Sequence, residues 1–544
     1  MNSSHLLNNP SSRSSTLHNL EREYLRTIRP LIDDKGYQHA ESLYQSLYED
    51  TQQAISELEN SHQSLNHQRY LALSNRQSLA LSSNISSQIR WSSTQQKGLK
   101  RFTHFLNALL IQHLQPSHIS ALSATRIPAL EQDQYAFGSN RLGRRYLLVL
   151  YKGHAWKMLV TDIKGRPATP AQLENSLYDL MRQTRESADL PFALPCYLTR
   201  EVQIELLQHA THHQQRICEA ITQALFSISL DDNHISDPED ALFHASFGDG
   251  GQYLCVKALS YHANLSDNHY YLHSETSLIN PAEVTNHLMA VQAHYHAANF
   301  PRRNYLPDKL PRQALDWSFD PSTREMLQEQ HAIYERQAER LISTPYHFFL
   351  SDEERKRFHQ NHPHALFHLL LHYAQLRTYK QLRSTFAIEF HASQPIMQET
   401  VSSAAVKLAE ALVNQERPQS ALMRDYITEY QRRQTLSLTG NNPHQQLSHL
   451  ERLLQPNPPL FFQDTHWSWF RQHPFVTINH SSEWIQNLCF APTTSDGISI
   501  SYSFQRNTIS LLITHPRYKS AEVERFAREI QAALKRLLNW LTRP

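Results

Sequence analysis

Apolar residues recur at helical spacing along most of the chain. Leu20, Tyr24, Leu25 and Ile28 lie on one face of the helical structure predicted over residues 17–90. The same spacing predicts helices over residues 95–114, 170–183, 200–212, 281–300, 320–341, 363–376, 399–433 with a break near Pro418, and 520–541. The polar residues 1–17, rich in Ser and Asn, predict a disordered tail.

Between these helices the pattern changes to short apolar runs with a period of two. Such runs predict strands over residues 146–150, 156–161, 192–197, 225–230, 253–261, 269–273, 476–479, 498–502 and 508–514. Lys152-Gly153-His154 separates the first two runs and predicts a hairpin. Helices alternating with mixed strands indicate an α/β fold, and 544 residues are enough for two or three domains.

Composition excludes several classes of function. The 52 basic and 51 acidic residues leave a net charge of +1, so no nucleic-acid or membrane-surface partner is expected. No apolar run approaches the roughly 18 residues of a membrane span. The chain has four widely spaced cysteines, which predict reduced thiols and a cytoplasmic location. Its 11 glycines form no phosphate-binding loop.

Histidine is abundant, with 34 residues. His364, His368 and His372 stand four residues apart on one predicted helix, and His209, His212 and His213 form a looser group. Histidines at this spacing can share a metal, but no HExxH motif or matched cysteine accompanies them. The sequence therefore predicts no metal site and no permanently bound cofactor.

The stretch from Ala491 to Tyr502 is the most informative part of the chain. It contains Ala491-Pro492, a turn at Asp496-Gly497, and a strand that alternates Ile498, Ile500 and Tyr502 with serines. A second strand and a long amphipathic helix follow. This ending resembles the choline/carnitine O-acyltransferase family, in which Gly-Pro-x-x-Pro-Asp-Gly-Tyr-Gly-x-x-Tyr precedes a strand pair and a final helix.

Other segments resemble the same family in the same order. The first is Ala124-Thr125-Arg126-Ile127-Pro128 with Asp133. The second is the strand pair 146–162, followed by Gly165-Arg166-Pro167 and the helix at Pro170. The third is Pro363-His364-Ala365, which opens a helix that ends in Thr378-Tyr379. The resemblance covers residues 18–544. It implies a two-lobed chloramphenicol-acetyltransferase-like α/β fold with mixed sheets covered by helices. Residues 18–99 would pack on the C-terminal lobe, residues 100–315 would form one lobe and 316–544 the other, with the active site in a tunnel between them.

The resemblance also implies a reaction, the transfer of an acyl group between acyl-CoA and a hydroxylated acceptor. One histidine acts as general base in this family, and His273 occupies its position. The family's acid, four residues later, is replaced by Ser277, and the glycine after it by Leu278. Glu275 is close in sequence but need not face the ring. A buried strand-end histidine with a structural hydrogen bond is the alternative interpretation of His273.

The remaining site residues are assigned by the same resemblance. Asn479 falls at the last position of a Ser-Thr-Ser motif and is a candidate oxyanion donor, or else a strand-end turn residue. Tyr379 matches an acceptor-binding tyrosine, or packs the end of a helix. CoA-binding candidates are Arg355, Lys356 and Arg357, which could also form a solvated face, together with Arg383. His364 replaces an aspartate that contacts CoA in the family.

Two departures bear on the acceptor. Pro443 stands where the family has its carnitine-selecting arginine, and Ala392 stands where a threonine helps to bind the carnitine carboxylate. The sequence therefore predicts a monomeric CoA-dependent O-acyltransferase whose acceptor is a hydroxylated small molecule other than carnitine. The alternative is a weakly active or inactive relative that binds a ligand or partner in the cleft between its lobes.

Overall fold

The computed structural model describes residues 10–50, 81, 83–91, 97–115, 122–126, 144–248, 250–276, 278–279, 281–296, 304–390, 395–416, 420–454, 457–480 and 482–541. Asp133, Ser277, Ala392 and Pro418 lie outside these residues. The chain divides into two compact units. Unit 1 comprises Met1–His67, Tyr346–Asn479 and Pro492–Pro544, and unit 2 comprises Gln68–Pro345 and His480–Ala491.

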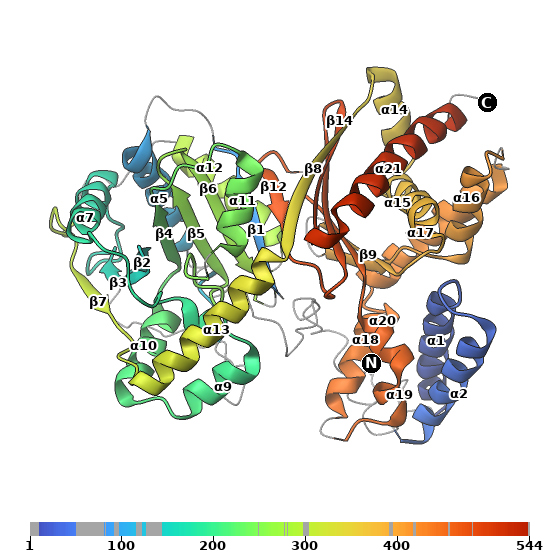
Figure 1. Ribbon diagram of the computed structural model, residues 1–544, viewed down its shortest axis with the longest axis horizontal. Coiled ribbons are helices and arrows are strands. Elements are labelled where there is room, and N and C mark those ends of the chain that lie inside the picture. Colours follow the sequence, from blue (N-terminus) through green and yellow to red (C-terminus); the bar gives the residue numbers. More distant parts are fainter. Residues whose placement is uncertain are drawn as a thin grey trace, which may run out of the picture. The chain divides into compact units, whose positions relative to one another are not determined.

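Unit 2 is built on an eight-stranded mixed sheet (Figure 1). Its strands, in spatial order, are β12 (Ile485–Cys489), β1 (Asn84–Ile89), β6 (His269–Glu275), β5 (Leu259–Asn264), β4 (Ser227–Asp231), β2 (Tyr146–Tyr151), β3 (His154–Leu159) and β7 (Arg312–Leu315). β4 runs parallel to both β2 and β5, and the other neighbouring strands are antiparallel. All six residues of β2 are buried, as expected for a strand inside a mixed sheet.

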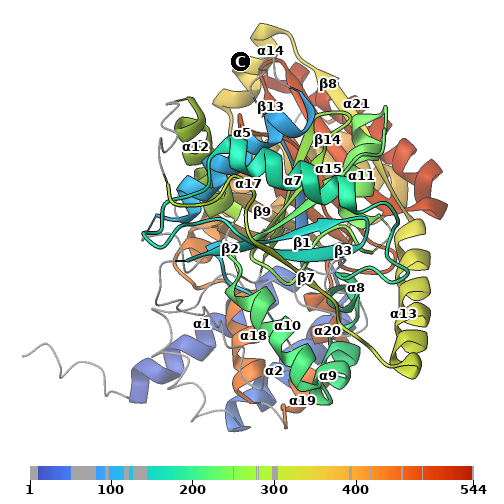
Figure 2. The same ribbon diagram turned by 90° about the vertical axis from the view of Figure 1, so that its left-hand side faces the viewer.

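The helices of unit 2 accompany this sheet. They are α5 (Gly98–His113), α7 (Pro170–Gln183), α8 (Leu194–Tyr197), α9 (Arg200–Gln208), α10 (His212–Gln223), α11 (Pro238–Phe247), α12 (Pro281–His296) and α13 (Pro321–Glu339). α5 packs between α7 and α12, and Figure 2 shows α5 beside α7, whereas α11 contacts β1, β6 and β12. A capping box of Thr169 and Gln172, with Pro170 as the first helical residue, fixes the start of α7.

Unit 1 contains a six-stranded sheet and a layer of helices (Figure 1). The strand order is β10 (Pro395–Glu399), β9 (Thr385–Phe390), β11 (Phe475–Asn479), β13 (Ile498–Gln505), β14 (Thr508–Pro516) and β8 (Leu341–Phe349), of which residues 346–349 belong to unit 1. Its helices include α14 (Asp352–Gln360), α15 (Pro363–Tyr379), α16 (Ser403–Val413), α17 (Ser420–Leu438) and α21 (Ser520–Leu541). Eleven of the 17 residues of α15 are buried, and the helix packs against α16 and α21, which places the apolar core of unit 1 around it.

A second apolar cluster in unit 1 joins segments that lie far apart in the sequence. We call it the helical cluster. It joins α1 (Pro10–Ile28) and α2 (Asp34–Asp50) to α18 (Pro443–Leu453), α19 (Leu460–Gln463) and α20 (Thr465–Arg471). Phe461 lies at its centre, with ring centroids 5.3 Å from Tyr24 and 5.4 Å from Tyr44 in edge-to-face contacts. Aromatic packing of this kind fixes the two N-terminal helices on α18–α20.

The α/β fold with two mixed sheets covered by helices is confirmed. The β2–β3 hairpin turns at Lys152 and Gly153, both with positive φ as a tight hairpin requires. The strand pair β13–β14 and the final helix α21 also form where the sequence predicts them. Asp496 and Gly497 do form a turn, closed by the Gly497 N–H donating to the Thr494 carbonyl at 3.0 Å. The turn joins no hairpin, because β12 and β13 belong to different sheets.

Several predictions of secondary structure are wrong. Residues 84–89, predicted as helix, form β1, which pairs with β6 and β12 on either side. Residues 192–197, predicted as a strand, contain the short helix α8, since Pro195 has no N–H for a sheet ladder. Of the helical region predicted over 399–433 with a break near Pro418, only the start is wrong, because Glu399 ends strand β10; the two helices α16 and α17 follow as predicted. α1 begins at Pro10, inside the predicted disordered tail.

The two units differ from the expected lobes in three places. β1 belongs to the sheet of unit 2 instead of packing with the N-terminal helices. α13 belongs to unit 2, although it lies beyond residue 315. Segment 480–491 returns to unit 2, where β12 completes the edge of the sheet beside β1. The places of β1 and β12 follow from strand pairing between distant segments.

Phe461 and its neighbour Leu460 give a direct test of the helical cluster. Phe461 is 1 % exposed and Leu460 is 68 % exposed on the same short helix. We expect Phe461→Ala to destabilise unit 1 by about 3–5 kcal/mol, the usual cost of removing a buried phenylalanine. Leu460→Ala is the matched control and should change stability by less than about 0.5 kcal/mol. Urea unfolding followed by tryptophan fluorescence measures both, and equal effects would contradict this role of Phe461.

Candidate functional site

His273 lies near the C-terminal end of β6 in unit 2. Strand pairing sets Ser86 of β1 opposite it on one side and Ser260 of β5 on the other. The residue is fully buried, at 0 % exposure. Its position is therefore fixed by a continuous sheet and not by a mobile loop.

The two imidazole nitrogens of His273 have different surroundings. Nδ1 shares a hydrogen bond of 2.8 Å with Oγ of Ser86. Nε2 is buried and has no hydrogen-bond partner among the described residues. If the Ser86 hydroxyl accepts the Nδ1–H, the lone pair lies on Nε2, which is the tautomer that a general base needs.

Aromatic rings surround the imidazole. The Tyr253 ring stacks on His273 with centroids 3.7 Å apart and planes 5° from parallel. His262 meets it edge-on at 6.1 Å. Burial, and to a lesser extent His262, lowers the pKa of His273 well below its ordinary value of 6.5. His273 is therefore neutral at physiological pH and able to accept a proton.

The buried acid nearest in sequence to His273 serves another partner. Oε1 of Glu275 lies 3.6 Å from Nη1 of Arg126, and the two side chains are 0 % and 11 % exposed. Arg126 thus compensates the carboxylate charge within unit 2. Leu278 is buried at 5 % exposure and can supply no charge. Of the described residues, Ser86 is the one that contacts Nδ1, and it is uncharged.

Asn479, the candidate oxyanion donor, ends β11 in unit 1. It is 6 % exposed, and its Nδ2 donates to the Tyr502 carbonyl at 3.3 Å. The Tyr502 hydroxyl in turn shares a hydrogen bond of 2.9 Å with Nδ1 of His364. Asn479 therefore links neighbouring strands, and this contact matches the structural interpretation of the residue.

Tyr379 and Arg383 contact each other at the C-terminal end of α15. The Arg383 guanidinium lies 4.6 Å from the centre of the Tyr379 ring. Burial is the main reason that the pKa of Tyr379 is raised. The ring also meets Phe475 at 5.7 Å and Phe526 at 6.2 Å, so it packs the end of the helix as well as supporting Arg383.

The basic triplet lies on α14, before the N-terminus of α15. Arg357 pairs with Glu353, Arg355 lies 4.0 Å from Asp352, and Lys356 is exposed. A 17-residue helix is about 25 Å long, so α15 separates this triplet from Arg383. The structure therefore does not bring the two sets together on one phosphate group.

The histidines of α15 are engaged by other side chains. Nε2 of His368 shares a hydrogen bond of 2.9 Å with Thr477, and its Nδ1 lies 2.9 Å from the Tyr430 hydroxyl. Nε2 of His372 bonds Thr400 at 3.0 Å, and burial lowers its pKa to about 3. His213 bonds a backbone carbonyl of unit 2. These contacts leave the spaced histidines as structural residues.

The structure also reveals a buried polar chain in unit 1 that sequence patterns do not show. Glu399 bonds the Ser384 hydroxyl, which lies 2.9 Å from Nδ1 of His473, and Nε2 of His473 lies 2.9 Å from Nε2 of His444. Burial raises the pKa of Glu399 and lowers that of His473 to about 3. His444 follows Pro443, the residue at the carnitine-selecting position, and the charges of Arg433 and Arg471 act on Glu399 and His444, so arginines border this polar chain.

Ser86 and Tyr253 were missed for a simple reason. Ser86 lies 187 residues from His273 along the chain, Tyr253 lies 20 residues before it, and neither belongs to a recognisable motif. Only the pairing of β1 with β6 brings Ser86 to the ring.

No helix in the described part of the chain has the length and apolar character needed to cross a membrane.

Solved structures of acyl-transferring and condensing enzymes resemble the chain weakly. Trichothecene 15-O-acetyltransferase from Fusarium sporotrichioides has a TM-score of 0.41 at 10% identity, covering 86% of this chain and 94% of that one. The wax ester synthase/diacylglycerol acyltransferase from Marinobacter aquaeolei VT8 has a TM-score of 0.32 at 11% identity, covering 87% and 98%. The first condensation domain of the CDA synthetase has 0.36 at 11%, covering 87% and 94%. Scores this low carry no argument about substrate.

Sequence comparison gives a more decisive result. No curated protein matches the chain. The family model described as choline/carnitine O-acyltransferase, however, matches residues 15–532, nearly the whole length. That range includes all of unit 2, most of unit 1 and every candidate site residue named above. The chain therefore belongs to the choline/carnitine O-acyltransferase family.

Proposed function

We propose that this protein is a CoA-dependent O-acyltransferase in which His273 is the general base. The observation that carries the proposal is the arrangement of His273, with Nδ1 bonded to Ser86 and a buried Nε2 that has no partner among the described residues. A substrate hydroxyl is the kind of group that such a nitrogen can deprotonate. Family membership supplies the acyl donor and the acceptor as substrate classes.

The reaction needs no covalent enzyme intermediate. Nε2 of His273 takes the proton of the acceptor hydroxyl. At the same time the hydroxyl oxygen attacks the thioester carbonyl of the acyl-CoA. When the tetrahedral intermediate collapses, the C–S bond breaks and the CoA thiolate receives the proton back from Nε2. The neutral Ser86 holds the ring, and the stacked Tyr253 limits its rotation.

The proposed acceptor is a hydroxylated molecule without a carboxylate. Pro443 begins α18 where an arginine would bind the carnitine carboxylate. Its neighbours His444 and His473 have pKa values lowered by burial, so they are neutral and attract an anion weakly. Tyr379 is the proposed acceptor-binding residue. Arg383 and the triplet Arg355, Lys356 and Arg357 are proposed to contact different parts of an extended CoA molecule.

One observation favours the alternative of a weakly active or inactive relative. Glu275 pairs with Arg126, and Ser86 cannot compensate a charged imidazole. Protonation of His273 during the reaction would then receive little stabilisation. Measurable CoA binding without thiol release from any acyl-CoA and alcohol would support this alternative over turnover.

Replacement of His273 is the first test. Free thiol release from acetyl-CoA and longer acyl-CoAs is measured with and without a panel of alcohols that includes choline and carnitine. We expect His273→Gln to lower acceptor-dependent release by about 10²–10⁴-fold, the usual contribution of a general base. His269→Gln, at the start of the same strand, is the matched control and should retain activity. Carnitine should give no release above the reaction without acceptor, and equal loss in both variants would contradict the assignment.

Ser86 is a proposed positioning residue for the imidazole. We expect Ser86→Ala to lower kcat about tenfold, the equivalent of one hydrogen bond, with little change in KM. Ser86→Thr keeps the hydroxyl and should restore most of the rate. Steady-state kinetics on the three proteins make the comparison. A change confined to KM, or failure of Thr to rescue, would argue against this role.

The pH profile gives an independent test. The pKa of His273 lies below its ordinary value of 6.5, so the base stays neutral as pH falls through that value. We therefore expect kcat/KM to remain nearly constant from about pH 8 down to below about pH 6.5, and to fall only at more acidic pH. A loss of rate centred near the ordinary histidine pKa would show that the free enzyme uses a more exposed base.

A further inference from the structure

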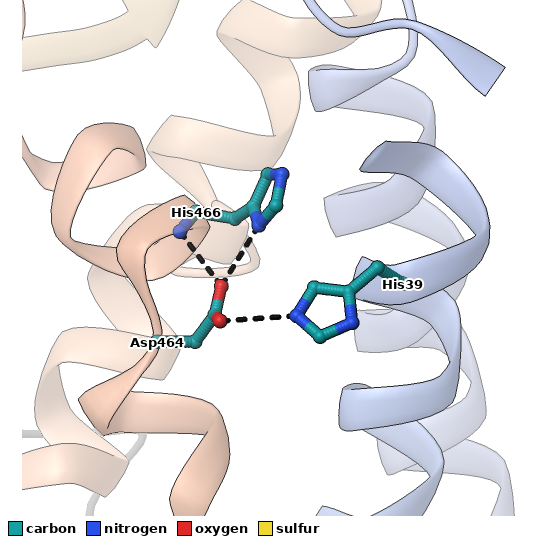
Figure 3. A group of neighbouring side chains, drawn as sticks. All are labelled: His39, Asp464 and His466. Carbon is teal, nitrogen blue, oxygen red and sulfur yellow. Dashed lines mark hydrogen bonds and ion pairs between the residues drawn. The ribbon is translucent and has the colours of Figure 1, made fainter. Parts of the chain in front are cut away.

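Three side chains of unit 1 meet beside the helical cluster (Figure 3). His39 belongs to α2, Asp464 lies between α19 and α20, and His466 lies in the first turn of α20. Nε2 of His39 is 3.1 Å from Oδ2 of Asp464, and Nδ1 of His466 is 2.9 Å from Oδ1 of the same carboxylate. One ligand atom from each residue lies within 4.8 Å of the other two.

We propose that His39, Asp464 and His466 form a binding site for a divalent cation of the zinc class. Imidazole nitrogens and a carboxylate are ligands that zinc accepts at about 2.0–2.2 Å, which sets tetrahedral ligand atoms about 3.3 Å apart. The 2.9 and 3.1 Å contacts run to different oxygens of the carboxylate, and one ligand atom from each residue lies within 4.8 Å of the other two, so movements of about 1–2 Å would bring three ligand atoms around the ion. His39 is 52% exposed, which leaves a fourth position open to water.

The site is held by structure that does not depend on a metal. Its neighbours on the same helices, Ala40 and Trp467, are 1 % exposed within the helical cluster. The His466 backbone N–H donates to Oδ1 of Asp464 at 2.7 Å, which fixes the carboxylate at the start of α20. The rings of His39 and His466 lie 5.4 Å apart and both face the carboxylate.

Gly36 makes room for one ligand. A Cβ at this position would lie 3.1 Å from Nε2 of His466, a tight contact for a side chain. The missing side chain allows the ring to lie against α2 with Nδ1 directed at Asp464. Nε2–H is then the tautomer that leaves the Nδ1 lone pair for a cation.

A bound ion would join α2 to α20, segments 425 residues apart in the sequence. His234 and Asp267 in unit 2 provide the comparison, because they form an ordinary imidazole–carboxylate pair at 2.5 Å that belongs to no three-ligand group among the described residues. The cluster of His39, Asp464 and His466 has a second histidine, which the His234–Asp267 pair lacks. A cation that recognises the cluster should therefore distinguish it from the simple pair.

Zinc titration of the full-length protein tests the site. The protein is treated with EDTA, dialysed and titrated with zinc chloride by calorimetry, beside His39→Gln, His466→Gln, Asp464→Asn and the control His234→Gln. We expect one strong equivalent in the wild type and the control. Each ligand variant should lose at least about tenfold in affinity, since even outer-shell partners of metal ligands are worth about 10–100-fold.

Two further measurements separate ligand loss from misfolding. Asn caps helices as well as Asp does, and His39 is exposed, so circular dichroism and melting temperature without metal should match the wild type. Saturating zinc should raise the melting temperature of the wild type and of His234→Gln, and not that of the ligand variants. Cobalt(II) should give visible absorption bands that zinc abolishes.

The proposal is overturned if the strong equivalent survives in the ligand variants or disappears equally in His234→Gln. It is also overturned if only weak binding spread over many histidines is found. The outcome is independent of thiol release, so failure of the acyltransferase proposal would leave this one standing.

Discussion

Backbone pairing between β1 and β6 determines what His273 can do. Their antiparallel register sets Ser86 opposite His273, and this alignment allows the 2.8 Å hydrogen bond at Nδ1. A slip of one residue would turn the side chain at that position to the other face of the sheet. β1 pairs with β12 on its other edge, so a segment from near residue 488 helps to fix a strand from near residue 86. The tautomer of a candidate catalytic base thus depends on pairing among three distant segments.

Charge around His273 is the second constraint. Burial disfavours the imidazolium, and the nearby acid, Glu275, is paired with Arg126. A buried carboxylate with an arginine partner is costly to free, because breaking such a pair leaves an uncompensated charge. Ser86 can orient the ring but cannot neutralise it. The site therefore favours a resting neutral base, and its efficiency depends on how far the substrate itself stabilises the charge that develops.

The sequence predicted the α/β class, the β2–β3 hairpin and the place of His273 in a strand, because each depends on local periodicity or on a motif. It failed where long-range pairing overrides local pattern. β1 was predicted as helix, and the partnership of Ser86 with His273 spans 187 residues. The roles of Tyr379, Asn479 and the basic residues remain predictions, since they rest on resemblance. The His39, Asp464 and His466 cluster has no spacing signature, because His39 lies 425 residues before Asp464.

The partners of the described histidines divide largely according to burial. Several buried rings bond hydroxyl groups, with Ser86 for His273, Thr477 for His368 and Thr400 for His372.

A hydroxyl partner adds no charge, so these rings stay neutral and suit either packing or base catalysis. Other buried rings differ: His262 lies 3.7 Å from a carboxylate oxygen of Asp231, and His444 bonds the ring of His473. More exposed rings such as His39 and His234 meet carboxylates directly. A carboxylate with two imidazoles offers a cation three ligands, whereas a hydroxyl with one imidazole offers it little. Burial and partner type, more than the number of histidines, therefore separate the candidate base from the candidate metal ligands.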